Sequence, residues 1–175
     1  MEQSKIEIVK QLAKDYNQFE KSLLQPAIIQ VTKCNQSQAV TWGQSHCNLL
    51  SWYFGLYADK KIDMSYSEYF KTLLDKNCCN EAGKTLFVKD KIAPICFGFE
   101  YDVKYLTNFD NVLNPDKLNK DSFYQLKINN SSHYMISWIE KIELMLADTH
   151  DRGYGVLAKT AKRVDKEHFE WMIRI

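Results

Sequence analysis

The sequence predicts a single α+β domain, with helices in the first half and an antiparallel sheet in the last third. Two patterns support this: apolar residues recur at helical spacing near the start, and alternating strand-like runs begin after residue 122. The length of 175 residues suits one hydrophobic core, and the 45% apolar and 26% charged residues are typical of a soluble globular protein. We therefore expect one domain over residues 1–175.

The first half begins with an amphipathic pattern over residues 6–23, which predicts a helix of roughly 20 residues that ends before Pro26. Residues 27–31 are expected to form a short extended connection. A loop over residues 41–46 then leads into an apolar run that predicts a helix from Cys47 to about Asp59.

The middle of the chain carries weaker signals. Residues 65–74 begin with Ser-Tyr-Ser-Glu, a capping box that predicts another helix. Within residues 77–120, short strand-like segments are expected at 84–88 and 95–99, and a loop or single helical turn at 111–119.

The last third reads as strands. Strand-like patterns cover residues 123–128, 133–140, 143–147 and 169–175, with a helical turn at 158–162. The short gap between the second and third of these strands predicts a tight antiparallel hairpin.

Charge and hydropathy exclude several classes of function. The formal net charge is +1, and basic residues are interleaved with acidic ones, so we expect no nucleic-acid partner. No apolar run approaches the length of about 18 residues that a membrane span needs. The charged N-terminal residues do not resemble a signal peptide, so a cytoplasmic location at synthesis is expected.

The motifs for metals and cofactors are missing from the sequence. No Cys-x-x-Cys or His-Glu-x-x-His spacing occurs, so we expect no metal, and no glycine-rich dinucleotide motif occurs either. Gly83-Lys84-Thr85 matches the end of a phosphate-binding loop, but the required earlier glycine is Cys78. No cofactor is therefore expected.

The residues that best indicate chemistry are Cys47, His133 and Asp148. Cys47 lies at the start of a predicted helix, where the helix dipole and unpaired N–H groups favour a thiolate. His133 opens a predicted strand, and a hairpin that turns near residue 141 sets it opposite residue 149, next to Asp148. A thiol, an imidazole and a carboxylate in this order predict a cysteine hydrolase.

Other cysteines are weaker candidates for the nucleophile. The count of five, at positions 34, 47, 78, 79 and 96, is odd and lacks framework spacing, so reduced thiols are expected. Cys34 remains an alternative nucleophile, although no apolar helix follows it, and Cys78 and Cys79 follow a helix end. Because unpaired cysteines are often buried, Cys47 as an inert core residue also stays open.

Alternatives to the other two residues also remain. His150 and Asp151 are local alternatives to Asp148, which is itself a candidate for an Asx turn. His46 is adjacent to Cys47 and a weak candidate base, and His168 is expected at the surface.

Three stretches, residues 45–52, 132–137 and 144–155, resemble the papain-like bacterial cysteine hydrolases of the NlpC and CHAP kind. The resemblance implies a papain-like fold in which the helix that carries the nucleophile packs on an antiparallel sheet. It also implies hydrolysis of an amide bond, with peptidoglycan peptides as the favoured substrate.

The resemblance also suggests roles for further residues and partners. The backbone N–H of Cys47, helped by Gln44, is expected to stabilise the oxyanion, and Trp42, Trp52 and Tyr134 are expected along the substrate cleft. An enzyme of this kind fits a phage lysin or a toxin delivered to the periplasm or cell wall of a rival cell. It leaves room for an inhibitor or immunity protein as a partner.

Two other functions fit the same residues. One is a thiol acyltransferase or deamidase that acts on protein through the same triad. The other is a non-catalytic papain-like binding module in which Cys47 is buried and inert.

Overall fold

A computed structural model describes residues 1–86, 96–99, 104–129, 132–150 and 156–175 of the chain. The helices are α1 (Gln3–Asp15), α2 (Leu24–Thr32), α3 (Gln36–Gly43), α4 (Cys47–Ala58), α5 (Tyr66–Asp75), α7 (Phe109–Val112) and α8 (Thr160–Arg163), with a short 3₁₀ helix η2 (Pro115–Lys117). The strands are β1 (Tyr124–Ile128), β2 (His133–Glu140), β3 (Glu143–Ala147), β4 (Leu157–Lys159) and β5 (Phe169–Arg174). The domain is thus mixed α+β.

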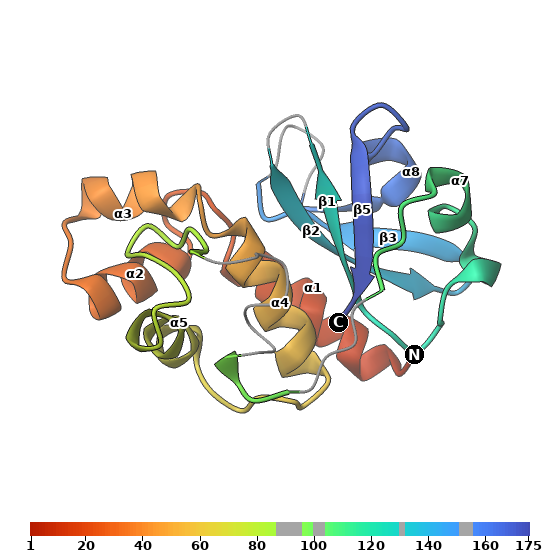
Figure 1. Ribbon diagram of the computed structural model, residues 1–175. Helices are drawn as coiled ribbons and strands as arrows, with labels where there is room; N and C mark the ends of the chain where they lie inside the picture. Colours follow the sequence, from red (N-terminus) through yellow and green to blue (C-terminus); the bar gives the residue numbers. More distant parts are fainter. Residues whose placement is uncertain (87–95, 100–103, 130–131, 151–155) are drawn as a thin grey trace.

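The strands form one antiparallel sheet in the order β4-β3-β2-β1-β5. Helices α1 and α4 lie between this sheet and the group formed by α2, α3 and α5, as Figure 1 shows. The four strands expected in the last third are present, and β4 adds a short edge strand where only a helical turn was expected. The strand-like segment expected at 95–99 is wrong, because its described residues 96–99 contain a helical residue and a turn.

Both faces of the sheet are buried, which explains why its strands carry so many apolar residues. One face joins the helices in a core that includes Ile136, Trp138 and Ile173. The other face forms a second cluster around Leu126, Leu146 and Met172, together with residues near α7 and α8. Strands β2 and β3 therefore lie between two apolar layers, one on each face of the sheet.

Helix α4 is the central element of the first core. Eleven of its residues are buried, and the helix is apolar on nearly all sides, as a helix inside a protein must be. A polar link fixes its first turn to the sheet: the amide Nε2 of Gln125 donates to Asn48 Oδ1 at 2.7 Å and to Ser51 Oγ at 2.8 Å. Buried hydrogen bonds of this kind set the position of the start of the helix relative to strand β1.

The predicted N-terminal helix is wrong in its second half, because α1 ends at Asp15 rather than near residue 23. The side chain of Asn17 donates to Lys14 O and accepts from the N–H of Phe19, which replaces helical hydrogen bonds with a local turn. The N–H of Gln18 donates to Thr149 O at 2.7 Å. The turn therefore connects to the loop after β3.

Two loops predicted in the first half are helical in the structure. Residues 27–31 lie in α2, where Pro26 occupies the first turn and its missing N–H leaves no bond unmade. Residues 41–43 lie in α3, which Asn35 caps by accepting the N–H of Gln38 at 2.8 Å. In contrast, α4 begins at Cys47 as predicted, and α5 begins with the predicted capping box at Ser65 and Glu68.

The expectation that all cysteines are reduced is also wrong, because Cys78 and Cys96 form a disulfide. The pairing depends on long-range folding and leaves Cys79, the neighbour of Cys78, as a separate buried thiol. Thr85, from the predicted segment 84–88, pairs with Cys79 in an isolated bridge, and residues 87–95 lie outside the described residues. In the described part of the chain, no helix has the length and apolar character to cross a membrane.

Candidate active site

Cys47 is the first residue of α4 and is buried. Its carbonyl accepts a hydrogen bond from Ser51 Oγ at 2.9 Å, within the turn that Gln125 fixes to the sheet. The thiol therefore lies at the positive end of a helix whose first turn is hydrogen-bonded to strand β1 of the sheet. This is the setting in which a thiolate is stabilised by the helix dipole.

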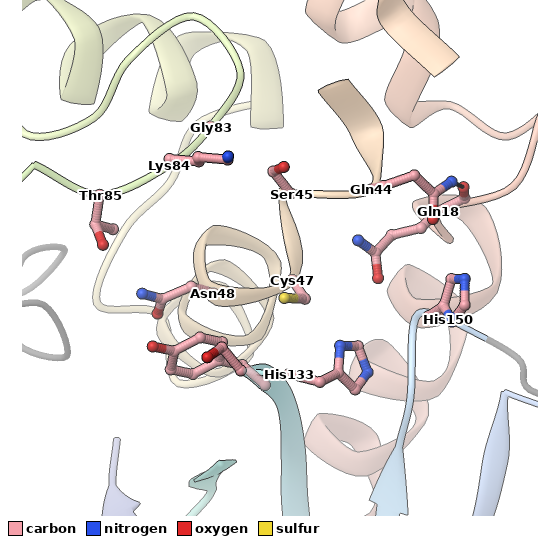
Figure 2. A pocket seen from close by; sticks show the side chains of 12 residues that line it. Gln18, Gln44, Ser45, Cys47, Asn48, Gly83, Lys84, Thr85, His133 and His150 are labelled. Atoms are coloured by element: carbon pink, nitrogen blue, oxygen red, sulfur yellow. Dashed lines mark hydrogen bonds between the residues drawn. The ribbon is translucent and has the colours of Figure 1, made fainter. Parts of the chain in front are cut away.

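His133 begins strand β2 and faces the start of α4 (Figure 2). Its Nε2 lies 2.6 Å from Asp148 Oδ1. Because Nε2 contacts Asp148, Nδ1 is the ring nitrogen left to interact with Cys47. The structure thus brings together the three residues that the sequence singled out.

The hairpin that joins His133 to Asp148 differs slightly from the predicted one. Glu140 pairs with Glu143, so the turn lies between Lys141 and Ile142, and this register would set His133 opposite residue 150 rather than 149. The ladder ends earlier, at the pair Ile136 and Ala147. Beyond it, the N–H of Asp148 donates to Val156 O at 2.7 Å, so the His133–Asp148 contact is made by side chains alone.

Three groups hold the Asp148 carboxylate. His133 and the N–H of His150 both interact with Oδ1, the latter at 2.9 Å, and Arg163 of α8 forms an ion pair with Oδ2. Burial alone would raise the pKa of Asp148, but these partners keep its pKa below the ordinary value. Arg163 was not identified from the sequence, because its role depends on how α8 packs beside β3.

The environment of His133 favours the protonated ring. Burial on its own lowers the pKa of His133, but the bonds and charges of Asp148 and Cys47 outweigh burial and raise this pKa to about 9. At neutral pH the ring is therefore an imidazolium that holds a proton between the thiol and the carboxylate.

A pocket of about 470 Å³ opens above Cys47. Segments from the helical part, from the turn at residues 83–85 and from the sheet line it: Gln18, Gln44, Ser45, Cys47, Asn48, Gly83, Lys84, Thr85, Ser132, His133, Tyr134 and His150. Its volume is within the range of small-molecule and peptide-residue sites. The reactive groups therefore face a space that a substrate can enter.

Gln44, expected as an oxyanion donor, lines this pocket, but its Nε2 donates to the backbone O of Gln18 at 2.7 Å. The buried Gln18 was missed by the sequence analysis. Its Oε1 accepts from Thr149 Oγ1 at 3.0 Å, and its Nε2 donates one hydrogen to Gly43 O at 2.9 Å. Figure 2 shows its carboxamide pointing into the pocket. No motif marks Gln18 in the sequence, because it lies within residues 6–23, which follow a helical pattern.

The three aromatic residues expected along the cleft have different positions. Tyr134 lines the pocket. Trp52 is only 1% exposed in the core, because it lies more than one turn into helix α4, which is buried on nearly all sides, and so it does not line this pocket. Trp42 packs beside the same core and is not among the lining residues.

The remaining candidates lie elsewhere or have other roles. Cys34 is half-buried between α2 and α3 and does not line the pocket, and burial raises the pKa of Cys79 to about 12. His46 is fully buried, and burial lowers its pKa to about 3. His168 is half-buried and pairs with Asp165. Asp151 lies outside the described residues.

No group of three or more metal-binding side chains lies together within the described ranges. A search of protein-family models, of curated proteins and of solved structures finds no match for this chain. What the site does must therefore be argued from its own geometry.

Proposed function

We propose that this protein is a cysteine hydrolase of amide bonds, with Cys47 as nucleophile, His133 as acid and base, and Asp148 as the group that orients the imidazole. The observation that carries the proposal is the buried contact of 2.6 Å between His133 and Asp148, on a ring that also engages a helix-start cysteine inside a pocket. A histidine held between a thiol and a carboxylate is the arrangement that thiol hydrolases require.

In the proposed reaction, Cys47 Sγ attacks the carbonyl carbon of the substrate amide. The resulting oxyanion accepts hydrogen bonds from the Cys47 backbone N–H and from the second Nε2 hydrogen of Gln18. Gln18 suits this role better than Gln44, since the Gln18 carboxamide points into the pocket and the Gln44 amide donates to a backbone carbonyl.

His133 then gives its proton to the leaving nitrogen, the C–N bond breaks, and a thioester to Cys47 remains. Water loses a proton to His133 as it attacks the thioester, and the acid product leaves with Sγ restored. The raised pKa of His133, about 9, keeps the ring protonated for the first of these proton transfers. Asp148 stays ionised throughout, because Arg163 and the N–H of His150 hold it.

The resemblance of the sequence to NlpC and CHAP hydrolases favours a papain-like arrangement and a peptidoglycan peptide as the substrate. The polar lining of the pocket, rich in amide and hydroxyl groups, is compatible with a peptide chain. An enzyme acting on the cell wall would work in the periplasm or at the wall.

The first test is the reactivity of the three free cysteines toward iodoacetamide at pH 7, followed by peptide mapping. We expect Cys47 to be labelled faster than Cys34 and Cys79, and equal slow labelling would contradict an enzymatic role. The second test is the digestion of purified peptidoglycan by the wild type and by Cys47→Ala. New free amines in the wild-type digest alone would support the substrate, whereas identical digests would remove it.

A further inference from the structure

The turn at Gly83-Lys84-Thr85 forms the pocket wall on the Asn48 side of Cys47, away from Gln18 and His150 (Figure 2). This is the segment whose sequence resembles the end of a phosphate-binding loop without its first glycine. The fold uses it differently, because it reaches the pocket as a turn between Cys79 and Thr85 rather than as the start of a helix.

The turn is built firmly enough to place a side chain. Asn80 closes it three times: its O accepts from the N–H of Gly83 at 2.9 Å, its N–H donates to Lys84 O at 2.9 Å, and its Oδ1 accepts from the N–H of Lys84 at 3.0 Å. An asparagine that bonds the backbone on both sides in this way fixes the turn locally.

Contact with a buried histidine positions the turn against the rest of the protein. Gly83 has a φ of +79°, and a Cβ there would lie 2.5 Å from Nε2 of the His46 ring. His46 is fully buried next to Cys47, and its Nδ1 lies 2.6 Å from the hydroxyl of Tyr66. The backbone of the turn therefore rests directly on the residue that precedes the nucleophile.

Lys84 is the only lysine or arginine that lines the pocket, and no aspartate or glutamate lies among the lining residues described. Its side chain extends from the turn toward the open centre of the pocket (Figure 2). The start of helix α4 and the His133 imidazolium add further positive potential. Asp148 is shared between two cations, the His133 ring and Arg163, so its single negative charge does not cancel both.

We propose that Lys84 makes this pocket selective for an acyl substrate that carries a carboxylate beside the scissile amide bond, such as an acidic peptide. The carboxylate would lie on the Asn48 side of Cys47, where Lys84 and the Thr85 hydroxyl meet the pocket. The proposal rests on the proposed function, since it assigns the substrate class of the same site. Lys84 is a specificity residue that takes no part in bond breaking.

Two reagents of nearly the same size test it without a known substrate. Iodoacetate carries a carboxylate and iodoacetamide a neutral amide, and both alkylate a thiolate by the same displacement of iodide. The quantity to measure is the second-order rate constant of iodoacetate at Cys47 divided by that of iodoacetamide, at pH 7 and low ionic strength. Lys84→Met should lower this ratio about two- to five-fold, and Lys84→Glu should lower it further.

The matched control is Lys61→Met, which removes the same charge from an exposed lysine outside the pocket. This variant should keep the wild-type ratio, and salt at about 0.5 M should reduce the difference between wild type and Lys84→Met. If Lys84→Met and Lys61→Met give the same ratio while Cys47 stays reactive, the substrate class is overturned and the hydrolase proposal stands. A Cys47 that reacts no faster than Cys34 in any variant overturns both.

Discussion

The described part of the chain contains two histidine–aspartate pairs of nearly equal length in opposite surroundings. His133 Nε2 and Asp148 Oδ1 lie 2.6 Å apart, with side-chain exposures of 6% and 0%. His168 Nδ1 and Asp165 Oδ1 lie 2.7 Å apart, with exposures of 37% and 64%. Because solvent screens an exposed pair and weakens its effect, length alone does not make such a pair useful for chemistry.

What separates the two pairs is the set of further groups around the buried one. Cys47 meets the other side of the His133 ring, and Arg163 holds the second oxygen of Asp148. The exposed pair is a local contact three residues apart. The comparison teaches that the candidate site depends on packing that brings four distant residues together.

The largest expected effect comes from removing the buried histidine, with removal of the other histidine as the control. His133→Gln should slow the alkylation of Cys47 by iodoacetamide at pH 7 by about 10²- to 10⁴-fold, because the thiol loses the imidazole that accepts its proton. His168→Gln should leave this rate unchanged. Similar rates in both variants would show that the buried pair does not activate the thiol.

Replacing the aspartate of each pair should change the stability of the protein by different amounts. Asp148→Asn should lower the free energy of unfolding by about 3–5 kcal/mol, because it breaks a buried ion pair with Arg163 and removes the carboxylate that also binds the His133 ring. Asp165→Asn, at an exposed site, should change it by less than about 0.5 kcal/mol. Urea unfolding of both variants measures the difference, and equal losses would argue against a buried ion pair.

The pH dependence of stability should show the buried pair directly. The pKa of His133 is raised from 6.5 to about 9, so the folded state binds this proton more tightly than the unfolded chain. Its contribution, ~3 kcal/mol at most, is fully present below pH 6.5 and is lost as the pH rises through about 9. In urea unfolding between pH 6 and pH 10, His133→Gln should weaken this alkaline loss, and an unchanged profile would contradict it.

His46 extends the comparison to a buried histidine whose Nδ1 partner is the Tyr66 hydroxyl rather than a carboxylate. Burial lowers its pKa from 6.5 to about 3, so its contribution has the opposite sign: it is present above pH 6.5 and is lost as the pH falls toward 3. The same measurements, continued to pH 4, should show this acid loss weakened in His46→Gln. If both variants lose stability on the same side of neutrality, the assigned environments are wrong.

The smallest effect concerns the turn that rests on His46. Gly83→Ala and Gly98→Ala both place a side chain at a positive φ, with a shared cost of about 1–2 kcal/mol. Only the first also meets the His46 ring, whereas a Cβ at Gly98 would meet no described atom within 4 Å. Thermal or urea unfolding should therefore show an additional loss of about 1–3 kcal/mol for Gly83→Ala, and equal losses would mean that the ring can move aside.

Much of the fold follows from patterns within a few residues. Strands β1, β2, β3 and β5 and the start of α4 match the alternation and the apolar run of the sequence. The capping box at Ser65 predicts the start of α5 because its hydrogen bonds are local. The end of α1 was harder to predict, since the local turn at Asn17 interrupts an apolar pattern that continues to residue 23, and the bond from Gln18 to Thr149 lies far along the chain.

The sequence by itself determined the mixed α+β class, the helix start at Cys47 and the hairpin that brings His133 near Asp148. Only the tertiary structure decided that Arg163 holds the carboxylate, and that Gln18 and Lys84 line opposite sides of the pocket. Periodicity and turn chemistry act on neighbouring residues, so they specify elements and short hairpins. The lining of a pocket depends on how separate elements pack, which local patterns do not encode.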